Sequence, residues 1–158
     1  MLFRSIIDLN SLSVVGTVAV GSFPRGVAIQ SDLNLAVVAN ASASTVSIVD
    51  LTKRAVVATV PVGIGPTSVA IDAYSNQALV TNSGVLRGVP TPGVAATMSI
   101  VNLDSYVVEN TIQLGYGAFG IDVDRASHRA FIAHFLSNEV MAIRIPNPVP
   151  HILDIQPK

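Results

Sequence analysis

The sequence feature that most constrains the fold is an internal repeat with a period of about 42 residues. Its first element is VVGTVAVG at 14–21, which returns as VVATVPVG at 56–63 and as VENTIQLG at 108–115. Its second element is GVAIQSDLNLAVVAN at 26–40, with counterparts at 68–82 and 120–134. Its third element is TVSIVD at 45–50, followed by TMSIVN at 97–102 and EVMAIR at 139–144. The chain is therefore built from one structural unit that is used several times.

The spacing of these elements gives the number of units and their boundaries. The first two units are 42 residues apart, whereas the middle unit is longer by about ten residues, between Asn82 and Thr97. SIIDLNSLSVV at 5–15 also lies 42 residues before SIVDLTKRAVV at 47–57, so the chain begins partway through a unit. We expect a single partial domain over residues 1–158, with repeats at about 14–55, 56–107 and 108–150 after a leading half.

Each unit has the pattern of four short strands. Runs rich in Val and Ile alternate with Gly, Pro, Asn, Asp and Ser, and no segment shows a sustained apolar period of 3.6 residues. The sequence therefore predicts an all-β chain with essentially no helix. Four antiparallel strands in about 42 residues are typical of a β-propeller blade, which buries its two faces only against neighbouring blades. We expect the second element to supply the two inner strands, the third element the next strand, and the first element the outer strand.

Several of these elements resemble the YVTN-type β-propeller repeat of bacterial proteins. The matching stretches are QALVTNS at 77–83, TMSIVNL at 97–103 and VVENTIQLG at 107–115, in the same order in each unit. The resemblance covers about Ser5 to Ile145, and the third unit departs most, with AFIAHF in place of LVTNS. It implies a propeller fold, commonly with seven blades, and a place in the bacterial periplasm, on the cell surface or outside the cell. It implies no particular activity.

Three and a half blades do not close a ring, because propellers usually have four to eight. Uncovered blade faces and sheet edges favour association. Three arrangements remain open: a fragment of a longer protein, a homodimer in which two partial rings complete one propeller, and an unusually small ring. Self-association into a homodimer is the partner that we predict.

Composition excludes several classes of partner and chemistry. Half of the residues are hydrophobic, 12% are charged, the net charge is −1, and no run of Lys or Arg occurs. Nucleic acid and anionic lipid are therefore not expected partners. The absence of cysteine excludes disulfides, thiolate catalysis and cysteine-bound metals. No apolar run reaches the roughly 20 residues that span a bilayer, and the first residues lack the pattern of an export signal.

The loops at one face of the predicted blades are the place where we expect a ligand. They are the three loops that enter the innermost strands, at 21–26, 63–68 and 115–120, and the three that follow the second strands, at 40–44, 82–96 and 134–138. Arg25 lies in the first of these loops, and Arg87 lies in the insertion at 83–96. Loops on a rigid scaffold often carry function, so both arginines are candidate ligand-binding residues.

Equivalent positions in the three units add further candidates. Asn40, Asn82 and His134 occupy one position; the two asparagines suit turn capping, whereas the histidine could act as a ligand or a base. Asp122 replaces the small residues of the other units, Ala28 and Ala70, on a predicted innermost strand. A carboxylate there needs a hydrogen-bonding partner, a cation or water. Asp122, His134, Asn82, Asn40, Arg25 and Arg87 therefore form the candidate ligand-binding set.

No motif in the sequence requires catalysis, a cofactor or a metal. It contains no G-x-S-x-G, H-E-x-x-H or P-loop motif, and the glycines of GYGAFG at 115–120 precede no helical pattern. The first hypothesis is a non-catalytic scaffold or binding module that presents one loop face to a protein, a glycan or a small ligand. The alternative is a propeller enzyme, such as a sugar-lactone hydrolase or a lyase, with a channel site that uses Asp122 and His134.

Overall fold

A computed structural model describes residues 2–86 and 89–145, and all regular structure in these residues is β. The strands form three main sheets, a two-stranded sheet at the N-terminus and a short hairpin. None of the described residues forms a helix, and so none forms a helix that could cross a bilayer. The strand bounds are β1 Leu2–Asp8, β2 Ser13–Val20, β3 Pro24–Gln30, β4 Leu35–Asn40, β5 Thr45–Asp50, β6 Ala55–Pro61, β7 Pro66–Asp72, β8 Gln77–Asn82, β9 Val85–Leu86, β10 Val89–Pro90, β11 Ala96–Asn102, β12 Val107–Gly115, β13 Ala118–Asp124, β14 Arg129–His134 and β15 Glu139–Arg144.

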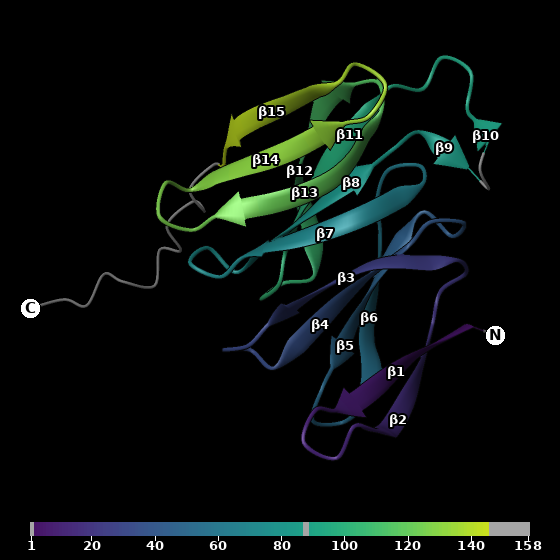
Figure 1. Cartoon of the computed structure of the whole chain (residues 1–158), viewed down its shortest axis with the longest axis vertical. Coiled ribbons are helices and arrows are strands. Elements are labelled where there is room, and N and C mark those ends of the chain that lie inside the picture. The colour runs from purple at the N-terminus through teal and green to yellow at the C-terminus, as the bar shows by residue number, and fades with distance from the viewer. Residues whose placement is uncertain (1, 87–88, 146–158) are drawn as a thin grey trace, which may run out of the picture.

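The sheets are the blades that the repeat predicts, with the predicted strand order. Blade 1 has the order β3-β4-β5-β6, blade 2 has the order β7-β8-β11-β12, and blade 3 contains β13-β14-β15. Strands β1 and β2 form a separate pair, here called the half-blade. The innermost strands are neighbours, because β7 contacts both β3 and β13. Figure 1 shows the blades fanned out from these strands, with the half-blade at one end and blade 3 at the other.

The hydrophobic core lies between the blades. Strands β4 and β8 are buried at every position, because blade 2 and the half-blade cover the two faces of β4, and blades 1 and 3 cover those of β8. One apolar cluster joins blade 1 to blade 2 through Val37, Ile48, Val69 and Ile71. A second joins blade 2 to blade 3, and a third joins the half-blade to blade 1. This arrangement explains a half-apolar composition, since strands buried on both faces need no polar side.

The hairpin turns repeat as closely as the strands. The turns between the two inner strands of each blade end at Asn34, Asn76 and His128, which all have φ near +50°. Asparagine tolerates this left-handed conformation better than most residues. The backbone N–H that follows each third strand donates to the carbonyl of that turn residue, from Leu51, Leu103 and Ile145 respectively.

The middle unit's insertion forms an excursion between β8 and β11 that carries the short β9–β10 hairpin. It leaves blade 2 after Asn82 and returns at Ala96, on the loop face. Arg87, one of the predicted ligand-binding residues, lies outside the described residues.

Candidate functional site

A pocket of about 170 Å³ opens at the loop face where the sequence predicts a ligand. Each of the six predicted loops contributes to its wall, so the pocket joins blades 1, 2 and 3. The described residues that line it include one arginine and no acidic side chain. The lining residues are Phe23, Arg25, Ala41, Thr67, Ser83, Val85, Phe119 and Phe135.

The charged group of the pocket is Arg25, and it lies between two aromatic rings. Its guanidinium carbon is 5.1 Å from the centre of the Phe23 ring and 5.5 Å from the centre of the Phe119 ring. The Phe119 ring in turn meets Phe135 edge to face, with 6.0 Å between ring centres. Both distances are within the roughly 6 Å at which a cation and an aromatic ring attract each other.

Phe23 adopts a left-handed backbone conformation, and the equivalent positions of the other two units are occupied by glycine. It has φ of 54°, and the equivalent residues are Gly65 and Gly117, with φ of 64° and 76°. A bulky residue is unfavourable in this left-handed region. A Cβ at Gly65 would clash with the Val85 carbonyl oxygen, and one at Gly117 would lie 2.8 Å from the Leu136 Cβ. Only the first unit therefore carries a side chain here, and that side chain stacks on Arg25.

Two buried threonines hold Phe119 in place from below. The hydroxyl oxygens of Thr67 and Thr81 lie 3.0 and 2.7 Å from the Phe119 carbonyl oxygen. Both hydroxyls belong to blade 2, whereas Phe119 is the second residue of β13, the innermost strand of blade 3. This contact fixes one wall of the pocket relative to the other blades.

Asn40 and Asn82 are buried beneath the loops and do not line this pocket. The Asn40 amide nitrogen donates to the hydroxyls of Thr45 and Ser47 at 3.2 and 2.9 Å. Asn82 makes the same pair of bonds to Thr97 and Ser99, at 3.0 and 2.9 Å. The carbonyl oxygen of each amide is buried and has no hydrogen-bond partner among the described residues.

Glycines lie directly over these amides. A Cβ at Gly21 would be 2.6 Å from the Asn40 Cγ, and one at Gly63 would be 2.7 Å from the Asn82 amide nitrogen. The repeated glycine thus makes room for the repeated asparagine, and the pair links the second strand of each blade to the loop above it.

His134 occupies the same position in blade 3 but has different partners. It is buried, and its Nδ1 lies 3.1 Å from the Tyr116 carbonyl oxygen, which fixes Nδ1 as the donor of that bond. Its Nε2 is buried and has no partner among the described residues. His134 does not line the pocket with Arg25.

Asp122 lies on the exposed part of β13, away from the pocket lining. One of its carboxylate oxygens accepts the Val123 backbone N–H at 2.8 Å. Within residues 2–86 and 89–145, no group of three His, Asp or Glu side chains could hold a metal ion. The structure therefore brings Arg25 to the pocket and leaves Asp122, His134, Asn40 and Asn82 elsewhere.

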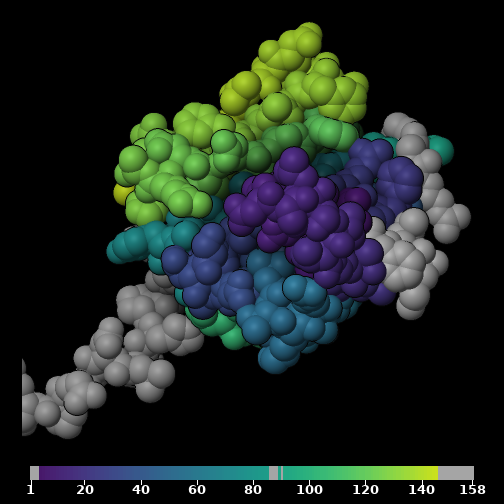
Figure 2. All heavy atoms as spheres, turned by 60° about the horizontal axis from the view of Figure 1, so that its bottom comes forward, coloured from purple at the N-terminus to yellow at the C-terminus, as the bar shows by residue number. Residues whose placement is uncertain are grey.

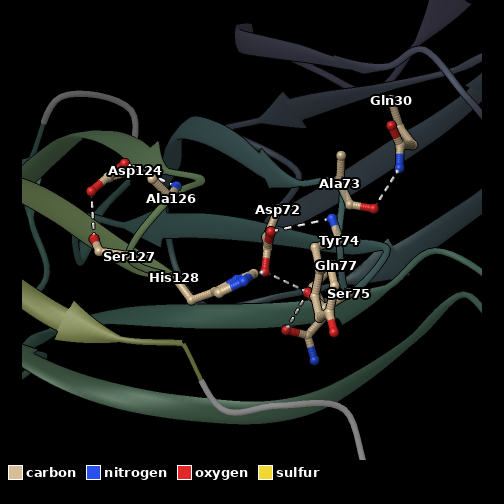
Figure 3. Close-up of polar contacts among 10 residues, drawn as sticks. All are labelled: Gln30, Asp72, Ala73, Tyr74, Ser75, Gln77, Asp124, Ala126, Ser127 and His128. Atoms are coloured by element: carbon tan, nitrogen blue, oxygen red, sulfur yellow. Dashed lines mark hydrogen bonds and ion pairs between the residues drawn. The ribbon is translucent and has the colours of Figure 1, made fainter.

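The opposite face carries polar contacts between blades, which Figure 3 shows. The Gln30 side-chain nitrogen of blade 1 donates to the Ala73 carbonyl oxygen of blade 2 at 3.4 Å, as Figure 3 shows. The same nitrogen lies 2.8 Å from the Asn76 side-chain oxygen. At the equivalent positions one blade further on, the carboxylate of Asp72 lies 3.5 Å from Nδ1 of His128. The partly exposed His128 ring also contacts the Tyr74 ring, with 4.7 Å between ring centres.

Turn carboxylates on this opposite face have lowered pKa values. Hydrogen bonds from the Ser127 hydroxyl and then from the Ala126 backbone N–H hold the pKa of Asp124 below its ordinary value. The Ser11 backbone N–H does the same for the pKa of Asp8, and the Lys53 backbone N–H for that of Asp50. These carboxylates stabilise turns and take no part in the pocket.

Comparisons with known proteins agree on the fold. The chain matches a functionally unknown protein from Desulfotomaculum acetoxidans DSM 771 with a TM-score of 0.75 and 19% identity, over 89% of this chain and 43% of that one. It matches the β-propeller domain of Cps50 (Swd1) from Myceliophteria thermophila with a TM-score of 0.63 and 15% identity, over 83% of this chain and 38% of that one. It matches the dihydro-heme d1 dehydrogenase NirN in complex with DHE with a TM-score of 0.63 and 17% identity, over 92% of this chain and 31% of that one.

The chain has a partial β-propeller fold. It spans less than half of the length of each of these solved chains. Identities this low show the fold alone, and propellers serve both as scaffolds and as enzymes. No protein-family model matches the sequence, and no curated protein matches it.

The aromatic residues of the pocket are not among those that the sequence singles out. Phe23, Phe119 and Phe135 lie in three different predicted loops, so no local motif joins them. One pattern could have found the first of them, because Phe23 aligns with two glycines. The meeting of all three around Arg25 depends on how the blades are placed side by side.

Proposed function

We propose that the chain is a non-catalytic binding module whose loop face binds a small organic anion in the pocket around Arg25. The observation that carries the proposal is the Arg25 guanidinium in cation–π contact with Phe23 and Phe119, in a pocket whose described lining has no acidic residue. A guanidinium carries five N–H donors in a planar fork. A planar carboxylate accepts two such donors side by side.

The shape and chemistry of the walls suggest the rest of the ligand. The volume of about 170 Å³ is close to that of an engineered apolar cavity of about 150 Å³ that binds benzene. Phe119, Phe135 and Val85 offer apolar surface beside the charge. A carboxylate joined to an apolar group about the size of a benzene ring suits both features, and such a mixture of apolar walls and few polar groups is typical of ligand sites.

Calorimetric titration with benzoate tests this proposal, with the neutral amide benzamide as a probe of the same shape. We expect benzoate to bind with a dissociation constant of about 0.1–1 mM, because nine non-hydrogen atoms support only a modest affinity. Benzamide should bind at least about tenfold more weakly, since a hydrogen bond to a charged group contributes about 1.5–3 kcal/mol.

Arg25→Gln should reduce benzoate affinity by about 10- to 100-fold, whereas Arg25→Lys should restore part of it, because lysine keeps the charge but not the two parallel donors. Arg125→Gln is the matched control, since Arg125 is an exposed arginine in a turn of the opposite face. Equal binding of benzoate and benzamide, or unchanged binding by Arg25→Gln, would contradict the proposal.

The enzyme hypothesis has less support, because Asp122 and His134 do not meet at the pocket. A metal-dependent site that uses Asp122 makes its own prediction, which differential scanning calorimetry can check. A rise in melting temperature with Ca²⁺, Mg²⁺ or Zn²⁺ that is lost in Asp122→Ala would favour it, because a ligand that binds the folded state stabilises that state.

The proposal also covers the family and the assembly. We assign the chain to the YVTN-type repeat family and treat residues 1–158 as one partial propeller domain, on the motifs quoted above. Self-association into a homodimer is supported by the uncovered apolar surface at both ends of the fan of blades.

A further inference from the structure

In the part of the chain that the structure describes, the half-blade has no counterpart of the two inner strands that every other blade has. β5 pairs with β4 on one side and β6 on the other, and β11 pairs in the same way with β8 and β12. β1 is the counterpart of these third strands and even has their bulge, after Ile6, where β5 has one after Ile48. Among the strands that the structure describes, β1 pairs only with β2, which leaves its inner edge open within residues 2–86 and 89–145. An open edge offers backbone N–H and C=O groups to another strand.

Apolar residues beside this edge are exposed where their counterparts are buried. Val27 and Ile29 of β3 are each 56% exposed, whereas the equivalent Val69 and Ile71 of β7 are each 7% exposed. The difference arises because β7 packs on the inner strands of blade 1, and β3 has no inner strands of the half-blade to pack on. A cavity of about 250 Å³, lined by Val27, Ile29 and residues of β1, marks the missing volume. Figure 2 looks toward this end of the molecule, with the N-terminal strands in purple at the front.

Blade 3 presents the complementary surface at the other end. Its outward face carries Phe131 and Ala133 of β14, which are both exposed. Their counterparts in blade 1, Val37 and Ala39, are fully buried beneath β7. Among the described residues, one end therefore lacks a pair of inner strands, and the other has a pair whose outward face is exposed.

The pairing of β14 with its own third strand is electrostatically poor. Arg129 lies directly opposite Arg144 of β15, and like charges at directly opposed positions are destabilising. β15 is also largely exposed, whereas β5 and β11 are largely buried. If β14 paired with β1 in the register in which β4 pairs with β5, Arg129 would lie opposite Asp8. A pair of opposite charges would then replace the pair of like charges.

We infer that β13 and β14 of one copy pair with β1 and β2 of a second copy and complete its half-blade, displacing β15. This inference rests on the proposed self-association and adds which strands join. Each chain then supplies blades 1 and 2 and half of each of two composite blades. The result is a two-fold symmetric ring of six blades, which is within the usual range.

The repeat fixes the register of the composite blade. Ala133 of one copy lies opposite Arg4 of the other, Phe131 opposite Ile6, and Arg129 opposite Asp8, as in the pairing of β4 with β5. Phe131 and Ala133 then cover the second copy's Val27 and Ile29. The backbone hydrogen bonds that β15 releases are replaced by those of β1, so no strand edge of β14 is left open.

The register can be tested by cross-linking, because the chain contains no cysteine. A copy with Ala133→Cys is mixed with a copy with Arg4→Cys and oxidised gently. We expect a disulfide-linked dimer from this pair, since directly opposite residues have suitable Cα separations. Ser5→Cys in place of Arg4→Cys is the control, because it shifts the register by one and points to the other face. Light scattering of the unmodified chain runs alongside and should give about twice the chain mass of 16.4 kDa.

Two variants separate strand exchange from other dimers. Arg144 lies outside the composite blade, and Arg144→Glu places an acidic residue opposite Arg129, which should strengthen the β14–β15 pairing within each chain. Because the dimer contains two composite blades, the substitution acts twice and should raise the dimer dissociation constant by about tenfold. Gly120→Ala should also weaken the dimer. A Cβ there has its nearest neighbour at 3.9 Å within one chain, but the equivalent Gly26 approaches the next blade within 2.7 Å. Arg125→Glu, with the same charge change in an exposed turn, should leave the dimer unchanged.

The outcomes separate this inference from the self-association on which it rests. A dimer with the Ala133–Arg4 cross-link and weakening by Arg144→Glu supports strand exchange. A dimer that cross-links equally well through Ser5→Cys, or whose dissociation constant is unchanged by Arg144→Glu, would overturn strand exchange and would still support self-association. A monomer at micromolar concentration overturns both, and the missing inner strands then come from another source.

Discussion

The close approach of the innermost strands of blades 1 and 2 makes Gly26→Ala a sharp test of the arrangement of the blades. A Cβ at Gly26 would lie 2.7 Å from the Ser68 Cα and 2.8 Å from the Thr67 carbonyl oxygen. Both are backbone atoms, so neither can move aside as a flexible side chain can. The Gly26 backbone itself has no left-handed φ, and an alanine could adopt it.

The expected cost is that of overpacking. Inserting a methyl group into a well-packed site costs about 1–3 kcal/mol. For a chain of this length, each kcal/mol lowers the melting temperature by about 2–4 °C. We therefore expect Gly26→Ala to lower the melting temperature by about 2–12 °C, measured by calorimetry at one fixed protein concentration.

Gly16→Ala is the control for the same chemical change on a strand. The nearest atom to a Cβ there is Cδ of Arg54, at 3.4 Å, in a flexible side chain. Alanine at an unstrained position lowers the entropy of the unfolded chain and stabilises by about 0.4–1 kcal/mol. If Gly16→Ala and Gly26→Ala changed the melting temperature equally, β3 and β7 would not lie as close as the structure shows.

Three further predictions concern other parts of the chain. Thr81→Val should lower the free energy of unfolding in urea by about 1–3 kcal/mol, because it removes the buried hydroxyl that lies 2.7 Å from the Phe119 carbonyl oxygen; an unchanged value would mean that Thr67 alone satisfies that carbonyl. Asn82→Ala should cost about 1–3 kcal/mol in the same assay, since it leaves the Thr97 and Ser99 hydroxyls without their amide donor; no loss would show that Asn82 adds nothing to the blade. Acidification below the ordinary aspartate pKa of 3.8 should reduce the melting temperature, because the pKa of Asp124 is lower in the folded chain than in the unfolded chain. The stability that Asp124 contributes is therefore present above pH 3.8 and is lost as the folded carboxylate takes up a proton. Asp124→Asn should flatten this pH dependence, and an unchanged pH profile in that variant would contradict the prediction.

The sequence predicts the fold well because each unit repeats the same local information. Glycine and asparagine recur at Gly21 and Asn40, and again at Gly63 and Asn82, and the structure packs each glycine on its asparagine. The strand order follows because each element has one position in the repeat. The spacing of the repeat also predicts the leading half unit and the insertion between Asn82 and Thr97, which are the half-blade and the β8–β11 excursion of the structure.

The sequence predicts the site less well because the pocket forms between units rather than within one. The loop face and Arg25 could be predicted from the repeat, yet the stacking of Phe23 and Phe119 on Arg25 joins blades 1 and 3. Residues that depart from the repeat identify some of the residues that line the pocket, but not all of them. Phe23 breaks it and lines the pocket, whereas His134 breaks it and is buried against a backbone carbonyl.

The contact of His128 with Asp72 shows the same limit on the opposite face. Both residues lie at turn positions whose local chemistry accounts for them. Only the stacking of blade 3 on blade 2 brings the imidazole within 3.5 Å of the carboxylate. Contacts across blades depend on the propeller geometry, and a single unit of the repeat does not contain that information.

The most direct test of the account is a titration of the ¹⁵N-labelled chain with benzoate, followed by the shifts of its backbone amide signals. The account predicts the largest changes at the loop face, at Phe23, Arg25, Thr67, Phe119 and Phe135. It also predicts that these changes disappear in Arg25→Gln while the rest of the spectrum is retained. Changes confined to the turns at 31–34, 73–76 and 125–128, or no changes at all, would contradict the claim that this face is the binding site.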